Sequence, residues 1–393
     1  MGRFQDALAA SGLSAIAEFK RRSPSAGDIR PGARVEEIVP AYASAGADAV
    51  SVLVDEAFAG SVDDLRAARA ATSAPLLAKG FFRQEAQLSE LKRAGADAVL
   101  LILRDLDDAT CTRLMLYASG LGLDTLVEAH DADELRRAED LGAPVIGVNA
   151  RDLSTFALDR RTQLDLVARA PRNRIVVAES AIHTRAQGAA AELAGADAIL
   201  VGSALMRAPE PAAKLAELLA RPLVKVCGMT RQEDVDVALE SGADLIGFIF
   251  APESPRAAPE LLDVPDTALS VAVFVGASED RGADLVQLYE REAGKVRGRD
   301  AVLLRDGERV ATVVDLPWDE QDETHLARAA AVNDRLVLAG KLDGETVRDA
   351  IAAVHPWAVD AASQLEREPG VKDHEKVRAF VAAARSTEEE EAA

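Results

Sequence analysis

The chain has 393 residues, of which 49% are hydrophobic, and a formal net charge of −21 at pH 7. This acidity argues against nucleic acid or an anionic membrane as the main partner, and no apolar run is long enough to cross a bilayer. The two cysteines, Cys111 and Cys227, give no disulfide framework, and the first residues lack the regions of a signal peptide, so we expect a cytoplasmic protein.

The length predicts two domains of roughly 200 residues, and a recurring phrase indicates how they are organised. The phrase is Gly-Ala-Asp followed by an apolar run, and its copies begin at Gly46, Gly95, Gly195, Gly242 and Gly282, with a looser copy at Leu141. Each copy follows an amphipathic stretch, and glycine at a helix end permits the left-handed conformation that turns the chain into the next strand. The repeat therefore predicts a helix, a glycine cap and a buried parallel strand.

Eight apolar runs before residue 205 are predicted to be strands. They are residues 15–20, 49–53, 74–79, 98–103, 125–129, 145–149, 174–180 and 198–203. Eight strands that alternate with helices are typical of a (β/α)8 or TIM barrel, and their even spacing favours closure over the alternative, a doubly wound open sheet. The first domain is predicted to span residues 1–220.

Polar residues lie at or near the carboxyl ends of these predicted strands. They are Lys20, Lys79, Glu128, Asn149, Ser180 and Ser203. This end of a (β/α)8 barrel holds the active site, and six convergent polar ends are hard to explain as separate structural ion pairs. Glu18 and Lys20 are two residues apart on one strand and face the same side, where burial is costly unless charges are paired or do chemistry.

Small residues after the last strand indicate a phosphate site. Gly202 and Ser203 lead into a predicted helix, whose free backbone N–H groups can bind an anion. A phosphorylated substrate is therefore predicted, with lysine and carboxylate groups directed at its other end. His130, two residues after Glu128, is interpreted as a structural histidine. No His, Cys and Asp cluster has metal-ligand spacing, so we expect neither a metal nor another cofactor.

Seven stretches between Ile16 and Met206 resemble the indole-3-glycerol phosphate synthase family, in the family's order. They are IAEFKRRSPS, FAGSVDDL, LLAKGF, TLVEAHD, GVNARDLSTF, VVAESAI and ILVGSALM. That family closes an indole ring on carboxyphenylamino-deoxyribulose phosphate, with loss of carbon dioxide and water. The resemblance implies the same reaction for the first half of this chain.

The resemblance also implies roles for individual residues. Lys79 is the general acid on the substrate ketone during ring closure, and Glu128 moves protons during dehydration. Lys20 is a phosphate contact or a second acid, while Glu18 and Asn149 orient substrate and catalytic groups. For Lys79 to act as an acid, neighbours such as Glu18 or Glu128 must tune its pKa. The phosphate contacts are Ser180, Gly202 and Ser203, and the other substrate contacts are Ser23, Phe81, Arg151 and Glu179.

The first half departs from the family pattern at three positions. Gly80 replaces the usual aspartate after the lysine, Ala150 replaces a second asparagine, and Ala181 replaces a glycine, which narrows one phosphate contact. The chain also begins late relative to the family's helical extension, which covers the aromatic end of the substrate. We expect the late start to affect affinity more than chemistry.

After Arg221-Pro222 the pattern restarts, and a second, shorter barrel is predicted over residues 221–386. The stretches VKVCGMTRQEDVDVALESGADLIGFIFAPESPR and AVDAASQLEREPGVKDHEKVRAFV resemble phosphoribosylanthranilate isomerase. That family performs an Amadori rearrangement with one base and one acid. The resemblance implies that Cys227 is the base, that Arg256 and Gln287 contact substrate, and that Asp360 is the family's aspartate on the last strand.

The middle of the second half departs from its family. AVLLRDGERVATVV, residues 301–314, predicts a hairpin, because Asp-Gly between apolar runs is a strong turn signal. A hairpin in place of a βα unit explains the short length. Asp315 is the best candidate for the general acid. Lys341 and Gln364 replace glycines of the phosphate cradle, and Lys341 either binds phosphate through its charge or blocks the cradle.

The sequence thus predicts an α/β chain of two tandem TIM barrels with two activities of tryptophan biosynthesis. One alternative keeps the synthase and makes the second barrel a degenerate, non-catalytic domain. Another is a phosphate-ligand binding protein without turnover, which the acid and base set Glu18, Lys20, Lys79 and Glu128 argues against. The expected partners are small phosphorylated, anthranilate-derived substrates, and the oligomeric state stays open, a monomer included. Residues 387–393 are predicted to be an acidic, disordered tail.

Overall fold

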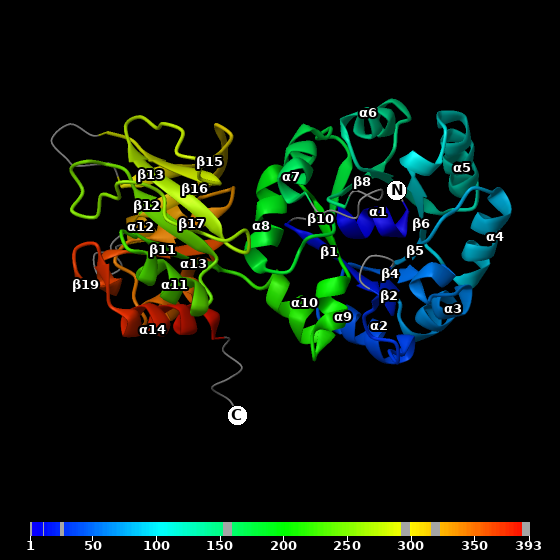
Figure 1. The fold of residues 1–393 in the computed structure, drawn as a ribbon, viewed down its shortest axis with the longest axis horizontal. Coiled ribbons are helices and arrows are strands. Elements are labelled where there is room, and N and C mark those ends of the chain that lie inside the picture. The colour runs from blue at the N-terminus through cyan, green and yellow to red at the C-terminus, as the bar shows by residue number, and fades with distance from the viewer. Residues whose placement is uncertain are drawn as a thin grey trace. The chain divides into compact units, whose positions relative to one another are not determined.

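The computed structural model describes residues 2–10, 12–23, 27–151, 159–291, 299–315 and 323–386. The chain divides into two compact units, one made of Met1–His183 and Gly188–Leu219, the other of Thr184–Gln187 and Ala220–Ala393. Each unit contains a closed eight-stranded barrel (Figure 1), which confirms the predicted pair of barrels. The predicted tail, residues 387–393, lies outside the described residues.

The first barrel is built from eight parallel strands. They are β1 (Ser14–Phe19), β4 (Ala49–Leu53), β5 (Leu76–Lys79), β6 (Ala98–Ile102), β7 (Asp124–Ala129), β8 (Val145–Asn149), β9 (Ile175–Glu179) and β10 (Ala198–Val201). Strands that follow one another in the chain are paired, and β10 pairs with β1, which closes the sheet. Closure confirms the barrel and excludes the open, doubly wound sheet.

Helices connect these strands and surround the sheet (Figure 1). They are α2 (Val35–Ser44), α3 (Val62–Ala71), α4 (Glu85–Ala94), α5 (Asp108–Gly120), α6 (Ala132–Asp140), α7 (Arg160–Arg169), α8 (Arg185–Ala194), α9 (Ser203–Arg207) and α10 (Pro211–Leu219), whereas α1 (Arg3–Leu8) precedes the first strand. A short hairpin, β2 (Arg22–Ser23) with β3 (Gly27–Asp28), follows β1, and single 3-10 turns η1 (Glu56–Phe58) and η2 (Leu103–Asp105) follow β4 and β6. The repeated glycine acts as predicted: Gly95 ends α4 with φ 102°, a conformation that glycine adopts without strain.

Alternate residues of a strand face opposite sides of the barrel wall, and this divides the first core in two. On β1, Ala15 and Ala17 belong to the cluster that packs against the outer helices, whereas Ile16 belongs to an inner cluster. Phe4 and Leu8 of α1 belong to the same inner cluster, and neither is exposed. The inside of the barrel is therefore filled with apolar side chains near its amino-terminal end.

Asp124, the first residue of β7, anchors α1 at this end. Its Oδ2 accepts the backbone N–H of Phe4 and of Gln5, both at 3.1 Å, and its Oδ1 accepts the Gln5 side-chain amide at 2.7 Å. These bonds satisfy N–H groups in the first turn that have no partner within the helix. With this end closed, the carboxyl ends of the strands are left to form a cavity.

The second barrel closes as well, but with mixed strand directions. Its strands are β11 (Leu223–Cys227), β12 (Leu245–Ile249), β13 (Leu269–Val275), β14 (Leu285–Tyr289), β15 (Asp300–Arg305), β16 (Glu308–Asp315), β17 (Leu336–Ala339) and β18 (Ala358–Ala361). β15 runs antiparallel to both β14 and β16, and the other pairs are parallel. Asp306 and Gly307, at φ 50° and 81°, form the turn between β15 and β16, as a tight hairpin requires. The predicted hairpin is confirmed.

Fewer helices cover the second barrel, which accounts for its length. The described helices are α11 (Gln232–Glu240), α12 (Glu323–Ala330), α13 (Val347–Val354) and α14 (His374–Arg385), with a 3-10 turn η4 (Ser363–Leu365) and a hairpin of β19 (Glu366–Glu368) and β20 (Val371–Lys372). The connections 250–268 and 276–284 are fully described and contain no helix. Irregular loops thus replace two of the usual crossover helices. The hairpin of β15 and β16 replaces a further strand-helix unit.

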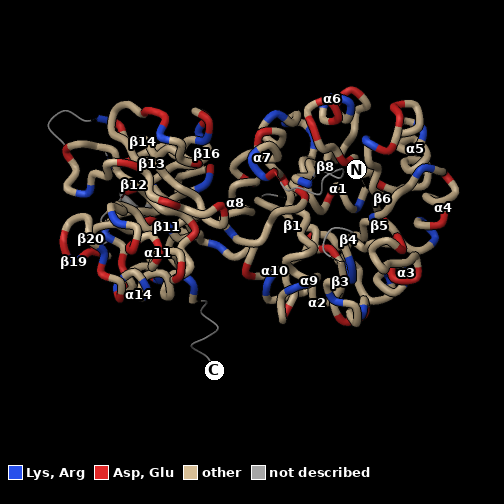
Figure 2. The backbone as a smooth tube through the Cα atoms, in the orientation of Figure 1, with Lys and Arg blue, Asp and Glu red and all other residues tan. Residues whose placement is uncertain are grey.

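Charged residues are spread along both units, with acidic and basic positions intermixed (Figure 2). The acidic excess is therefore not confined to one segment. Across the described ranges, none of the helices combines the length and the apolar character that a bilayer crossing requires.

Candidate active site

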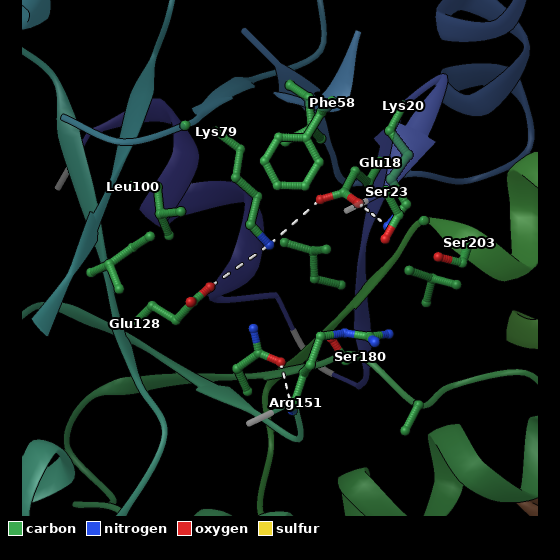
Figure 3. Close-up of a pocket in the computed structure, with 18 of the residues that line it drawn as sticks. Glu18, Lys20, Ser23, Phe58, Lys79, Leu100, Glu128, Arg151, Ser180 and Ser203 are labelled. Carbon is green, nitrogen blue, oxygen red and sulfur yellow. Dashed lines mark hydrogen bonds and ion pairs between the residues drawn. The ribbon is translucent and has the colours of Figure 1, made fainter. Parts of the chain in front are cut away.

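The carboxyl ends of the first barrel's strands surround a cavity of about 350 Å³. It brings together eleven of the predicted site residues (Figure 3), namely Glu18, Lys20, Ser23, Lys79, Phe81, Glu128, Asn149, Arg151, Ser180, Gly202 and Ser203. They come from six of the eight barrel strands and the segments that follow them. The convergence predicted from the strand ends is therefore present in the structure.

Lys79, the last residue of β5, lies among three carboxylates. Its Nζ is 2.6 Å from Glu179 Oε2, 3.5 Å from Glu18 Oε2 and 3.8 Å from Glu128 Oε2. Burial opposes the ammonium charge, but the three carboxylates outweigh it and raise the pKa of Lys79 above its usual range. Lys79 is thus a protonated ammonium in the wall of the cavity, as a general acid must be.

Glu179 lies behind Lys79 and does not face the cavity. The sequence placed it among the substrate contacts, but its side chain is 0% exposed and its Oε2 accepts the Lys79 hydrogen bond. A Cβ at Gly147 of the neighbouring strand β8 would lie 2.1 Å from Glu179 Oε1, so the glycine provides the space for this carboxylate. Burial is the main cause that raises the pKa of Glu179, and the charge of Glu128 adds to it while that of Lys79 opposes it.

Glu18 and Lys20 form the charged pair predicted at the end of β1. Lys20 Nζ is 2.8 Å from Glu18 Oε1, and both side chains line the cavity. Burial raises the pKa of Glu18, but Lys20 and Lys79 outweigh burial and lower it. A Cβ at Gly202, after β10, would lie 2.3 Å from Glu18 Oε1, so a second glycine provides space for a site carboxylate. The costly burial of Glu18 is therefore compensated by two ammonium groups.

His130, which sequence reasoning set aside as structural, lies beside Glu128. Its Nε2 is 3.1 Å from Glu128 Oε1, and its Nδ1 is 3.0 Å from Oε2 of Glu134 in the first turn of α6. Burial opposes the imidazolium, but the two carboxylates outweigh it and raise the pKa of His130 to about 10. Burial also opposes ionisation of Glu128, whereas His130 and Lys79 lower its pKa. The spacing of His130 from Glu128 is the sequence signal that could have revealed this contact.

The loops after β8 and β9 form another part of the cavity wall. Asn149 Oδ1 accepts the backbone N–H of Arg151 at 3.0 Å, which fixes the start of the loop that carries Arg151. Ser180 and Ala181 have φ values of 70° and 55°. Ala181 thus adopts the left-handed backbone that glycine takes readily, and it replaces the family's glycine at a cost of about 1 kcal/mol. Ala181 lines the cavity, so its side chain occupies space that a glycine would leave open near the predicted phosphate contact.

Apolar side chains line the rest of the cavity, and sequence reasoning missed most of them. Leu53, Leu100 and Ile102 contribute from the strands, while the Phe58 and Phe81 rings lie 6.3 Å apart, centroid to centroid. Phe81 is 39% exposed, an unusual position for a large apolar side chain. Arg104 and His183 also line the cavity without having been predicted. The cavity therefore combines charged and apolar side chains, which suits an amphipathic ligand.

The second barrel holds a buried polar cluster at the end of its first strand. Lys225 Nζ lies 2.7 Å from Asp360 Oδ2 and 2.7 Å from Gln287 Oε1. Cys227 is two residues farther on β11 and 5% exposed, and burial raises the pKa of its thiol while Lys225 opposes this rise. A Cβ at Gly247 of the neighbouring β12 would lie 2.5 Å from Cys227 Sγ, so this glycine provides the space for the sulfur.

A chain of hydrogen bonds connects this cluster with Asp315. The Gln287 amide donates to Tyr289 Oη at 2.9 Å, and Tyr289 Oη donates to Asp315 Oδ2 at 3.1 Å. Gln287 also accepts from Lys225, so its amide has partners on both sides. Sequence reasoning predicted Gln287 as a substrate contact, but it is 1% exposed and lies inside this chain of bonds. The structure thus joins the predicted base and acid regions through one buried network.

Arg256 lies next to Cys227 but is already paired. Its Nε is 2.8 Å from both carboxylate oxygens of Glu366, which Lys372 Nζ also contacts at 3.0 Å. A Cβ at Gly228 would lie 3.1 Å from Arg256 Cδ, which places Arg256 beside the end of β11. Lys341 is exposed at φ 54°, the left-handed backbone that the family's glycine would adopt readily. To contact a substrate anion, Arg256 must therefore either leave Glu366 or bind the anion and Glu366 together.

In the parts of the chain that the structure describes, no group of three or more His, Cys, Asp or Glu side chains is arranged to hold a metal ion. Both cysteines are buried free thiols.

Comparison with protein families identifies two regions. A sequence model described as indole-3-glycerol phosphate synthase matches residues 2–218. A second, described as N-(5'phosphoribosyl)anthranilate (PRA) isomerase, matches residues 297–383. The second range contains Asp315 and Asp360 but neither Cys227 nor Arg256.

Individual proteins are similar to one or both halves. A multifunctional tryptophan biosynthesis protein from Phycomyces blakesleeanus is 32% identical over 490 residues, which cover 96% of this chain and 63% of that protein. An indole-3-glycerol phosphate synthase from Albidiferax ferrireducens is 45% identical over 214 residues, covering 54% of this chain and 81% of that protein. A crystal structure of TrpF from Jonesia denitrificans is 27% identical, covers 42% of this chain and 97% of that one, and has a TM-score of 0.33. This chain thus spans less than two thirds of the multifunctional relative.

Proposed function

The chain belongs to the indole-3-glycerol phosphate synthase family, and on that premise we propose that its first barrel converts carboxyphenylamino-deoxyribulose phosphate into indole-3-glycerol phosphate. The observation that carries this proposal is the position of Lys79, whose ammonium lies within 3.8 Å of three glutamate side chains in a cavity that apolar side chains also line. Ring closure needs a cation where charge develops on the ketone oxygen, and a carboxylate for the proton transfers that follow.

The lining of the cavity favours one orientation of the substrate. The anthranilate ring is placed against Phe58 and Phe81, and the phosphate against Ser180, Gly202 and Ser203. These groups line one cavity with Lys79, so a substrate bound this way brings its ketone to the centre (Figure 3). Binding energy from the two ends then positions the reacting atoms, which is a large part of what an enzyme can contribute to such a step.

Lys79 protonates the ketone oxygen as the aromatic carbon attacks the carbonyl carbon, and loss of carbon dioxide restores the aromatic ring. The raised pKa keeps Lys79 protonated until the oxygen becomes strongly basic in the transition state. Glu128 then accepts a proton from the ring carbon next to the nitrogen, while Lys20, as the second acid, donates a proton to the hydroxyl, which leaves as water. Glu18, paired with Lys20, lies beside the Lys79 ammonium, and Glu179 fixes this ammonium from behind.

For the second barrel we propose phosphoribosylanthranilate isomerisation, the preceding step of tryptophan biosynthesis. Support comes from the family match over residues 297–383 and from the buried network that joins the Cys227 region with Asp315. In this proposal Cys227 is the base and Asp315 the acid, while Arg256 and Asp360 contact substrate. Because both cysteines are unpaired thiols, a reducing cytoplasm is the proposed location.

The test is to measure the two half-reactions separately on the full chain. Lys79→Ala should lower the synthase turnover by about 10² to 10⁴-fold and leave isomerase turnover unchanged. Cys227→Ala should give the reverse pattern. Lys214→Ala is a matched control, since this lysine lies on α10 and pairs with Glu217 at the surface.

The alternatives predict different outcomes of this measurement. A chain in which only the synthase reaction runs has a degenerate second barrel. A phosphate-ligand binding protein binds the substrate analogue in both the wild type and Lys79→Ala but turns over neither substrate. Either result contradicts the proposed pair of activities.

A further inference from the structure

His130 occupies a position between two carboxylates that the proposed mechanism does not use. It follows the last residue of β7, and Asp131 after it caps α6 by accepting the backbone N–H groups of Asp133 and Glu134. This cap brings Glu134 back towards the strand end, where its Oε2 accepts the His130 backbone N–H at 2.9 Å and lies 3.0 Å from the ring Nδ1. The ring is thus fixed through both its backbone and its Nδ1.

The other ring nitrogen faces the proposed proton-transfer carboxylate. His130 Nε2 lies 3.1 Å from Glu128 Oε1. A carboxylate oxygen lies within 3.1 Å of each ring nitrogen, so the ring is best stabilised as the imidazolium, whose charge forms an ion pair with Glu128 at Nε2 and whose Nδ1 donates to Glu134. The charged groups that face the ring are Glu128 on β7 and Glu134 on α6, and those that face Glu128 are His130, Lys79 on β5 and Glu179 on β9.

The ring is close to the cavity without forming part of its wall. Glu128 lines the cavity, and His130 is absent from the described residues that do so. The side chain of His130 is 9% exposed, and that of Glu128 is 3% exposed. A role for His130 in the reaction would therefore act through Glu128 and not through contact with substrate.

We propose that His130 is a positioning residue: as an imidazolium held by Glu134, it orients the Glu128 carboxylate and keeps it ionised for proton transfer in the synthase reaction. This inference rests on the proposed function of the first barrel. Its Nε2 holds Glu128 Oε1, which leaves Oε2, 3.8 Å from Lys79 Nζ, as the oxygen available for proton transfer. Without the imidazolium, a carboxylate this deeply buried would be driven towards its neutral form.

The pKa directions agree with this arrangement. Burial would raise the pKa of Glu128, and the contact with His130, then the charge of Lys79 and then the charge of His130 lower it below its usual range. The reciprocal effect raises the pKa of His130 to about 10. Both directions favour an ionised Glu128 beside a protonated His130.

The test compares kcat/KM of the synthase reaction between pH 5.5 and 9 for the wild type and His130→Gln. Glutamine keeps a donor but carries no charge, so Glu128 should become easier to protonate. Burial, no longer opposed by the imidazolium, should raise the pKa of Glu128 in the variant, so we expect the ratio of variant to wild-type kcat/KM to fall from pH 8 to pH 5.5, by about tenfold for each unit that the pH lies below that raised pKa. His355→Gln, at an exposed position of the second unit, is the matched control and should keep a ratio near one.

A ratio that stays constant over this range, whatever its value, overturns the proposal and makes His130 a structural residue. Should His130→Gln fail to fold, Glu134→Gln is measured in its place, and the same fall, smaller in size, is expected because the cation loses its second partner. Nitrogen-15 NMR of the wild-type imidazoles gives an independent readout: both nitrogens of His130 should stay protonated above pH 8, and a titration near pH 6.5 refutes the proposal. If the wild type has no synthase turnover at all, the proposed function itself fails, and the NMR result then shows separately whether the imidazolium exists.

Discussion

Gly147→Ala should disable the synthase through a single added methyl group. Gly147 lies on β8, and a Cβ there would be 2.1 Å from Glu179 Oε1 and 3.3 Å from Leu126 Cδ2. Glu179 is fully buried and holds the Lys79 ammonium at 2.6 Å, so it has no open space into which to turn. The substitution therefore displaces the group that fixes the proposed general acid, without changing any residue that touches the substrate.

The size of the effect follows from these distances. Heavy atoms rarely approach a Cβ more closely than 3.0 Å, so the Glu179 oxygen must retreat by roughly 1 Å, and Lys79 must follow it or lose the bond. A displacement of this size in a catalytic group costs about 10²-fold in rate. Overpacking a core in this way also costs about 1–3 kcal/mol of the free energy of unfolding. We expect kcat to fall by about 10²-fold, with a smaller change in KM.

Two control variants separate this effect from general damage. Gly247→Ala places a Cβ 2.5 Å from Cys227 Sγ in the second barrel, so it should impair the isomerase and leave the synthase unchanged. Gly188→Ala, in helix α8, meets Ile199 Cδ1 at 3.6 Å, an ordinary contact, and should preserve both activities. Both half-reactions and the urea unfolding curve are measured for each variant. Full synthase turnover in a folded Gly147→Ala chain would refute the idea that Glu179 fixes Lys79.

Three further predictions concern stability. Lys225→Met leaves Asp360 buried without its ion-pair partner and should lower the free energy of unfolding of the second unit by about 3–5 kcal/mol, measured by urea unfolding with the isomerase as a second readout. Asp124→Ala removes three accepted hydrogen bonds at the start of α1 and should cost the first unit about 1–2 kcal/mol, with an unchanged second unit as the internal control. The pKa of His130 is raised in the folded state from 6.5 to about 10, so its stabilisation is complete below pH 6.5 and is lost as the pH rises through 10; unfolding curves between these limits should show this loss in the wild type and a flatter profile in His130→Gln.

The number and order of the strands could be predicted because two repeated signals in the sequence, the apolar runs and the glycines before them, agree. Apolar runs give the buried strands, and the glycine at the end of each helix marks where they begin. On β1 the alternation also places Ile16 and Glu18 on the same inner face, so the charged strand ends could be predicted to converge. In the second half the Asp306-Gly307 turn predicted the hairpin from local chemistry alone.

The pairings inside the site could not be predicted in the same way. Glu179 and Lys79 are 100 residues apart, and the sequence does not specify which of three nearby carboxylates holds the ammonium most closely. That choice depends on side-chain direction within a shared interior, where fractions of an ångström decide the partner. Gln287 and Glu179 were predicted as substrate contacts, but both lie one layer behind the residues proposed to meet the substrate.

The three glycines beside site side chains point to a common rule of construction in this chain. Gly147 gives space to Glu179 of the next strand, Gly247 gives space to Cys227 of the preceding one, and Gly202 after β10 gives space to Glu18 of β1. In each case the reactive or charged side chain lies over a glycine of the neighbouring strand. The space that this glycine leaves lets the side chain stay buried while its polar end reaches the middle of the barrel. A parallel barrel brings its strand ends too close for every inner position to carry a large side chain. The placement of the acids and bases therefore depends as much on where side chains are missing as on where they are present, and a search for chemistry in such a sequence should read its strand glycines together with its charges.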